Sequence, residues 1–84
     1  MEYLIKEYIK NLTINDIKKF AIKKNINITD NDAIILFDYA KNYYQDILNG
    51  NDKDIINELK NKLSPNVFKE TYKIYLEYKI KYLK

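Results

Sequence analysis

The sequence predicts an all-α protein, a compact bundle of four to five short helices that forms a single domain over residues 1–84. Three observations lead to this prediction. Apolar residues recur every three or four positions through most of the chain, which is the period of an amphipathic helix. Threonine, serine and aspartate stand just before these periodic stretches, as helix N-caps do. Apolar residues make up 46% of the chain, which suffices for one modest core.

The first two helices are expected over residues 2–11 and 13–24. Thr13 and Asp16 match an acidic relative of the capping box, in which each side chain accepts a hydrogen bond from the backbone N–H of the other residue. Asn25 is expected to end the second helix in a left-handed conformation. The apolar positions of the two helices are Leu4, Ile5, Tyr8, Ile9 and Leu12 in the first, and Ile14, Ile17, Phe20 and Ala21 in the second.

A third helix is expected after a short extended connector at residues 26–28. Thr29 and Asp32 repeat the capping signal at its start. The clearest apolar stripe of the chain follows, formed by Ala33, Leu36, Phe37, Ala40 and Tyr44. The sequence leaves two places for the end of this helix: a break at Asn42, or a continuation to Leu48.

The only glycine of the chain, Gly50, marks a turn. A fourth helix is expected after it, over residues 52–62, with Asn51 or Asp52 as its cap. Its apolar positions are Ile55, Ile56, Leu59 and Leu63.

The dipeptide Ser64–Pro65 predicts the start of a fifth and last helix. Serine is a favoured N-cap, and proline is favoured at the first helical position because it has no N–H to leave unsatisfied. No stop signal interrupts the periodic pattern that follows, so this helix is expected to extend to about Tyr82.

The chain lacks two residue types on which enzymes and metal sites often depend. It contains no His and no Cys, which removes the commonest general bases, nucleophiles and metal ligands. A calcium loop beginning at Asp46 needs Gly at its sixth position and Glu at its twelfth. Here Gly50 is fifth and Asn57 is twelfth. We therefore expect an interaction module rather than an enzyme, with no catalytic residue, no cofactor and no metal ion.

Three features predict a cytoplasmic protein that does not enter a membrane. The absence of Cys fits a reducing compartment. The first seven residues carry too many charges, too early, for a signal peptide. The longest apolar run, residues 33–37, is far shorter than the roughly 20 residues that a membrane span needs.

Four tyrosines share the last helix and are the leading candidates for a binding surface: Tyr72, Tyr75, Tyr78 and Tyr82. With the apolar residues of that helix they cover an arc of about 200°, roughly twice what a peripheral helix needs. Two interpretations explain the width. Either this helix is central and the other four surround it, or part of the arc faces a second chain, since tyrosine suits partly wet interfaces. The function we predict is therefore non-catalytic binding of a protein partner, with self-association through this helix included.

The alternative function is nucleic-acid binding through a lysine-rich helix face, formed by Lys18, Lys19, Lys23 and Lys24 and extended by Lys73, Lys81 and Lys84. The helix, short extended connector and next helix resemble the helix-extended-helix modules of the SAP and Rho N-terminal types over about a third of the chain. The chain has no Arg, however, and bidentate reading of guanine favours Arg.

Charge is distributed in blocks. Residues 1–28 carry six lysines against three acids, residues 29–58 two lysines against seven acids, and residues 59–84 seven lysines against two acids. Either acidic helices pack beside basic ones, or the basic segments form a surface for an anionic partner.

About four-fifths of the chain, from Leu12 to Tyr78, resembles the YqfT-like proteins, a small family from low-GC Gram-positive bacteria. The matching landmarks are Leu12 to Ile17 before Phe20–Ala21, Asn25 to Thr29 with Ala33, Ile47 to Asn49, the helix around Leu59, and Leu63 to Pro65. At Asn42 the sequence departs from the family pattern, which has Gly after a basic residue. The resemblance implies a helical fold and an intracellular setting. It implies no activity and transfers no site residue.

Overall fold

The computed structural model describes residues 2–82, and the side chains of residues 6–81, as an assembly of α-helices without strands. The helices are α1 (Glu2–Lys10), α2 (Ile14–Lys23), α3 (Asp30–Leu48), α4 (Lys53–Lys62) and α5 (Pro65–Tyr82). The predicted all-α bundle is confirmed. None of these helices combines the length and the apolarity needed to cross a membrane within the described part of the chain.

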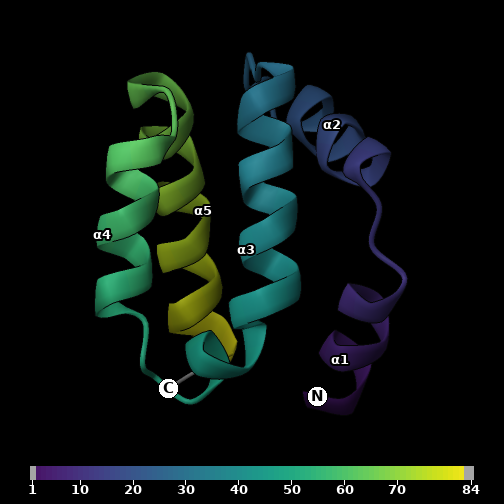
Figure 1. The fold of residues 1–84 in the computed structure, drawn as a ribbon. Coiled ribbons are helices and arrows are strands. Elements are labelled where there is room, and N and C mark those ends of the chain that lie inside the picture. The colour runs from purple at the N-terminus through teal and green to yellow at the C-terminus, as the bar shows by residue number, and fades with distance from the viewer. Residues whose placement is uncertain (1, 83–84) are drawn as a thin grey trace.

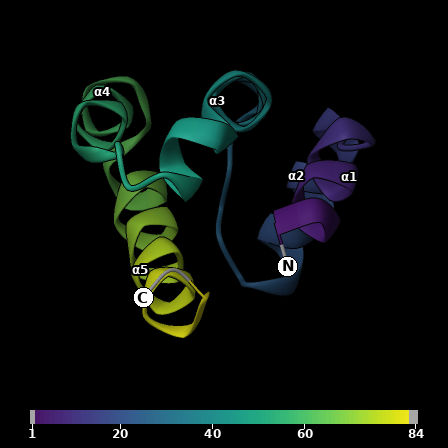
Figure 2. The ribbon, with the colours of Figure 1, turned by 90° about the horizontal axis from the view of Figure 1, so that it is seen from below.

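The longest helix, α3, is the centre of the arrangement. It contacts α1 and α2 on one side and α4 on the other, and α4 in turn packs against α5 (Figure 1). Viewed from below, α4 and α5 lie together to the left of α3, and α1 and α2 lie to its right (Figure 2). The interpretation of the last helix as a central one is therefore wrong, because α3 takes that position and α5 lies beside α4.

The capping boxes predicted for the second and third helices form as expected. Thr13 and Asp16 make a reciprocal capping box, with hydrogen bonds of 3.1 and 3.0 Å. Asn25 has a positive φ of 59°, and Gly50 one of 84°, so both occupy the left-handed region that asparagine and glycine tolerate best. The helix α3 passes through Asn42 and ends at Leu48, which settles the end that the sequence left open. Asn42 is exposed, and the weak helix propensity of a single asparagine costs only about 0.7 kcal/mol.

The core lies between α3, α4 and α5. Tyr39, Ile55, Leu59, Leu63 and Val67 are buried together there. Partly buried residues pack against this cluster: Ile26, Ile28, Ile35, Leu36, Tyr43, Ile47 and Phe68. Two of them, Ile26 and Ile28, belong to the connector between α2 and α3. The connector isoleucines therefore pack against the core cluster.

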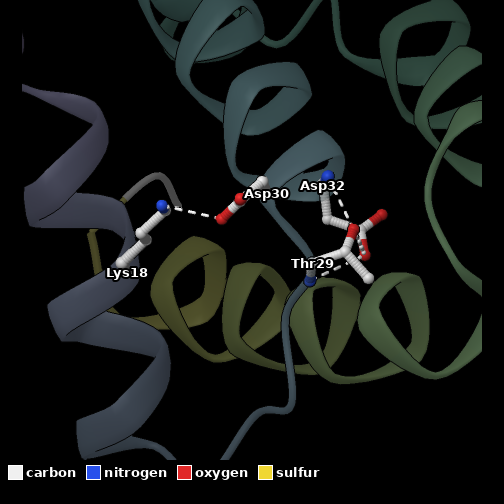
Figure 3. A network of polar contacts seen from close by, with 4 residues as sticks. All are labelled: Lys18, Thr29, Asp30 and Asp32. Carbon is white, nitrogen blue, oxygen red and sulfur yellow. Dashed lines mark hydrogen bonds and ion pairs between the residues drawn. The ribbon is translucent and has the colours of Figure 1, made fainter.

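The start of α3 holds a buried carboxylate. Asp32 is 1% exposed and forms the second capping box with Thr29, drawn in Figure 3. It also accepts hydrogen bonds from the backbone N–H and the hydroxyl of Ser64, at 2.9 and 2.8 Å. Beside it, Lys18 of α2 pairs with Asp30 at 2.7 Å and ties α2 to the same end of α3 (Figure 3). One end of α3 therefore joins α2 to the α4–α5 junction.

Candidate functional site

The tyrosines of α5 do not form one surface. Tyr75 faces the start of α4, Tyr72 faces outward, and Tyr78 faces α1 and α3. Tyr75 points toward the start of α4, where its hydroxyl donates a short hydrogen bond to Asp52. Lys79, one turn further along, pairs with the same carboxylate at 3.2 Å. Burial, together with the neighbouring Asp52 charge, raises the pKa of the Tyr75 phenol well above its usual range. The phenol is therefore a neutral structural donor rather than a nucleophile.

Asp52 has a different role from the one that the sequence suggested. It stands at the N-cap position of α4, but its side chain makes no capping hydrogen bond. The carboxylate instead accepts from Tyr75 and Lys79 on α5, and these contacts hold its pKa below the usual value despite partial burial. The prediction that Asp52 acts as a side-chain cap is wrong, because a tertiary partner competes successfully for its oxygens.

Tyr72 lies on the outer side of α5. Its ring stacks on Phe68 with centroids 5.5 Å apart and planes 11° apart, and approaches the Tyr75 ring at 6.4 Å. The side chain is 37% exposed. Such a ring is already ordered by its neighbours while one face stays accessible, which lowers the entropy cost of an additional contact.

Tyr78 lies on the other side of α5, where it lines an apolar hollow with Tyr8 and Tyr44. The side chain of Tyr82 lies outside the described residues. The four predicted site tyrosines are thus divided: two point toward α4 and the outer face, and one points toward α1 and α3.

An exposed apolar ridge runs along the outer face of α5. Tyr72, Leu76 and Ile80 follow one another at intervals of four residues and are 37%, 38% and 65% exposed. Residues four apart on a helix form a continuous row that can pack into another helix. We call these three residues the α5 ridge. The sequence contained the spacing of Leu76 and Ile80, but not the information that α4 covers the adjacent face and leaves this one free.

A shallow depression between α4 and α5 borders the ridge. Its volume is about 220 Å³, and its lining residues are Asp52, Lys53, Ile56, Tyr72, Tyr75, Leu76 and Lys79. The depression is lined by both charged and apolar side chains.

On the opposite side of α5 an apolar groove follows α3. It consists of two hollows of about 210 and 400 Å³ that share Ala40 as a lining residue. The first lies between α2, α3 and α5, and the second between α1, α3 and α5. Together they are lined by Tyr8, Ile9, Ile17, Phe20, Ala21, Ile26, Ile28, Leu36, Ala40, Tyr44, Ile47, Leu48, Thr71, Ile74 and Tyr78. We call this feature the α3 groove.

The lysines predicted for nucleic-acid binding are spread around α2. Lys18 pairs with Asp30 of α3. Lys24 lies over the Phe20 ring, with its Nζ 5.8 Å from the ring centroid. Lys19 and Lys23, one turn apart, are exposed and share a face of the helix. Only two of the four lysines therefore present a common surface away from other protein groups.

The remaining polar contacts are structural. The Tyr39 hydroxyl donates to Glu58 at 2.8 Å, and Lys62 lies over the Tyr39 ring at 5.4 Å. Lys41 donates to the carbonyl oxygens of Ile9 and Lys10, at 2.7 and 2.8 Å, and so caps α1. Over the described residues, no three acidic side chains gather closely enough to hold a metal ion.

Comparison with known proteins adds no further constraint: no family model, no curated protein and no solved structure matches this chain. The resemblance to the YqfT-like proteins stays a prediction.

Proposed function

We propose that this chain is a cytoplasmic, non-catalytic protein-interaction module that self-associates through the outer face of α5. The observation that carries the proposal is the α5 ridge, where Tyr72, Leu76 and Ile80 are exposed in one row. Large apolar side chains that share a helix face and stay in water favour association with a second surface. Lys53, Asp52 and Lys79 lie in the depression that borders the ridge, and charged groups at the border of an apolar row are common at the rims of protein interfaces.

Sedimentation equilibrium over a range of protein concentrations tests the proposal. Self-association predicts an apparent mass that rises with concentration toward that of a dimer. Ile80→Glu places a charge in the ridge and is expected to weaken association about tenfold or more. Ile22→Glu is the matched control, because Ile22 is 75% exposed and lies on α2, away from the ridge. A wild-type chain that stays monomeric at all concentrations contradicts self-association.

A second candidate function, nucleic-acid binding, is supported by the exposed pair Lys19 and Lys23. The affinity for a duplex and for a single strand, measured at two salt concentrations, tests it. Phosphate contacts predict binding that is strongest at low salt and weaker in a Lys19→Glu, Lys23→Glu double variant. Absence of binding at low salt rules this function out.

A further inference from the structure

The dipeptide Asn49–Gly50 ends α3 and is open to solvent. Both residues are exposed, and beyond its chain neighbours no atom lies within 4 Å of the position that a Cβ would take at Gly50. Gly50 is the only glycine of the chain. Asn49 is therefore the only asparagine of the chain that precedes a glycine.

An asparagine side chain can react with the backbone nitrogen of the next residue. The nitrogen of Gly50 attacks the Asn49 Cγ, a C–N bond forms, and a five-membered imide ring closes. The bond from Cγ to the side-chain nitrogen breaks, and that nitrogen leaves as ammonia with the proton that the Gly50 amide gives up. Water then adds to one of the two imide carbonyls, which yields either aspartate or isoaspartate. Glycine favours the attack because it has no Cβ to obstruct the approach.

The last turn of α3 controls how easily this attack occurs. The Gly50 N–H donates to the carbonyl of Ile47 at 3.1 Å, and the Asn51 N–H donates to that of Asp46 at 2.8 Å. The first of these bonds must break before the nitrogen can turn toward the side chain. Both bonds lie at an exposed helix end, where local opening needs far less free energy than global unfolding. The attack is therefore accessible to the folded chain.

The neighbouring asparagine provides an internal comparison. Asn51 is exposed in the same connector, but Asp52 follows it, and the carboxylate of Asp52 is held against α5. A Cβ on the following residue hinders the approach that Gly50 permits. The other asparagines of the chain also precede residues that carry a Cβ. Asn49 is therefore expected to react first.

Either product adds a negative charge at an unfavourable place. The C-terminal end of a helix carries a partial negative charge, and the last turn of α3 contains no basic residue. Isoaspartate also lengthens the backbone by one methylene group at position 49. The hydrogen bond from Asn51 to Asp46 spans that position and would lose its geometry. The loosening is expected to stop at Asp52, because α5 holds that side chain.

We propose that Asn49 is a site of spontaneous deamidation, and that its conversion frees the end of α3 while α4 and α5 stay in place. The reaction consumes only water and needs no enzyme. This inference does not depend on self-association, because Asn49 lies outside the α5 ridge.

Incubation of the full chain at mildly alkaline pH tests the first part of the proposal. Peptide mass spectrometry detects the replacement of an amide by a carboxyl group, and chromatography separates aspartate from isoaspartate. We expect conversion at Asn49 to be about tenfold or more faster than at Asn51. The same chain in urea gives the rate without the turn, and the folded chain should react no more than about tenfold more slowly. Stronger protection in the folded chain, or equally fast conversion at Asn51, overturns the proposal.

Two matched variants locate the reaction. Asn49→Gln should abolish the release of ammonia and the acidic product, because attack on a glutamine side chain requires a six-membered ring that closes far more slowly. Asn51→Gln makes the same change two residues later and should react as wild type does. Persistence of the acidic product in Asn49→Gln, or its loss in Asn51→Gln, contradicts the assignment to Asn49.

Hydrogen exchange tests the second part. In the converted chain, purified by ion exchange, the amides of Asn49, Gly50 and Asn51 are expected to exchange about three to ten times faster. The amide of Ile56 donates to the carbonyl of Asp52 at 2.9 Å, in the first turn of α4, and should keep its rate within about twofold. Unchanged exchange at the end of α3, or an equal increase in α4, contradicts the proposed local loosening.

Discussion

The carboxylate of Asp32 accepts two hydrogen bonds from Ser64, one from the backbone N–H at 2.9 Å and one from the hydroxyl at 2.8 Å, across 32 residues of sequence. The same carboxylate accepts from the N–H and the hydroxyl of Thr29. Asp32 therefore caps its own helix and at the same time positions the α4–α5 junction. Because α5 carries the proposed interface, this buried contact determines where the interface lies relative to α3.

Replacement of Asp32 is expected to destabilise the fold strongly. Asp32→Asn removes the charge and places amide N–H groups against donors, so we expect a loss of about 2–4 kcal/mol in the free energy of unfolding. Urea unfolding followed by circular dichroism measures this loss. Asp16→Asn is the matched control, because Asp16 belongs to the same kind of capping box but its contacts are exposed. It should cost less than about 1 kcal/mol, and equal losses in the two variants would show that the link to Ser64 contributes nothing.

The pH dependence of stability follows from the same group. Burial tends to raise the pKa of Asp32, but the hydrogen bonds from Ser64 and Thr29 outweigh it and hold the pKa below the ordinary value. A carboxyl group with a lowered pKa stabilises the fold above its unfolded pKa of about 3.9 and loses that contribution as the pH falls through the folded value. The difference in unfolding free energy between wild type and Asp32→Asn should therefore be full at pH 7 and shrink in acid. A difference that is constant from neutral to acid pH is the contradicting result.

Tyr75→Phe tests the contact between α5 and the start of α4. The substitution keeps the ring but removes the hydroxyl that donates to Asp52, so we expect a loss of about 1–2 kcal/mol in the free energy of unfolding. Absorbance of phenolate during an alkaline titration provides a second readout. Tyr75 and Tyr39 both have raised pKa values, from burial first and from neighbouring carboxylates next, and the variant should lose one late-ionising phenol. If the variant instead loses a phenol that ionises at the ordinary pH of about 10, and the late ionisations are unchanged, this contact is contradicted.

Lys41→Met tests how α1 is held to α3. The variant keeps an unbranched apolar side chain over Phe37 but loses the donors to the carbonyls of Ile9 and Lys10. We expect faster hydrogen exchange in α1 with little change in the α3–α5 core, because the lost bonds lie outside that core. A uniform increase in exchange along the whole chain would show instead that Lys41 stabilises the fold globally.

Local sequence signals predicted most of the helices. The capping pairs Thr13–Asp16 and Thr29–Asp32, and the turn at Gly50, depend on residues within a few positions of each other, so their chemistry is readable in the sequence. The end of α3 was left open because Asn42 alone neither stops nor favours a helix strongly. Packing of Tyr43 and Ile47 against the core carries the helix past it.

Contacts between helices that are distant in the sequence were harder to predict. Helical periodicity shows which residues of α5 share a face, but not which neighbour each face meets, and the tyrosines are therefore divided between α4 and the α3 groove. Periodicity placed Ala40 and Tyr44 on the apolar stripe of α3, but it did not show that they line that groove. Asp52 and Ser64 were expected to cap helices, and no local pattern reveals that their side chains bond instead to Tyr75 and Asp32.

The most direct test of self-association through the α5 ridge is isotope-filtered nuclear Overhauser spectroscopy on a mixture of labelled and unlabelled chains. This measurement detects only contacts between different copies. We predict intermolecular contacts that involve the methyl groups of Leu76 and Ile80 and the ring of Tyr72. An absence of intermolecular contacts at high protein concentration, or contacts confined to residues of the α3 groove, would contradict the proposal.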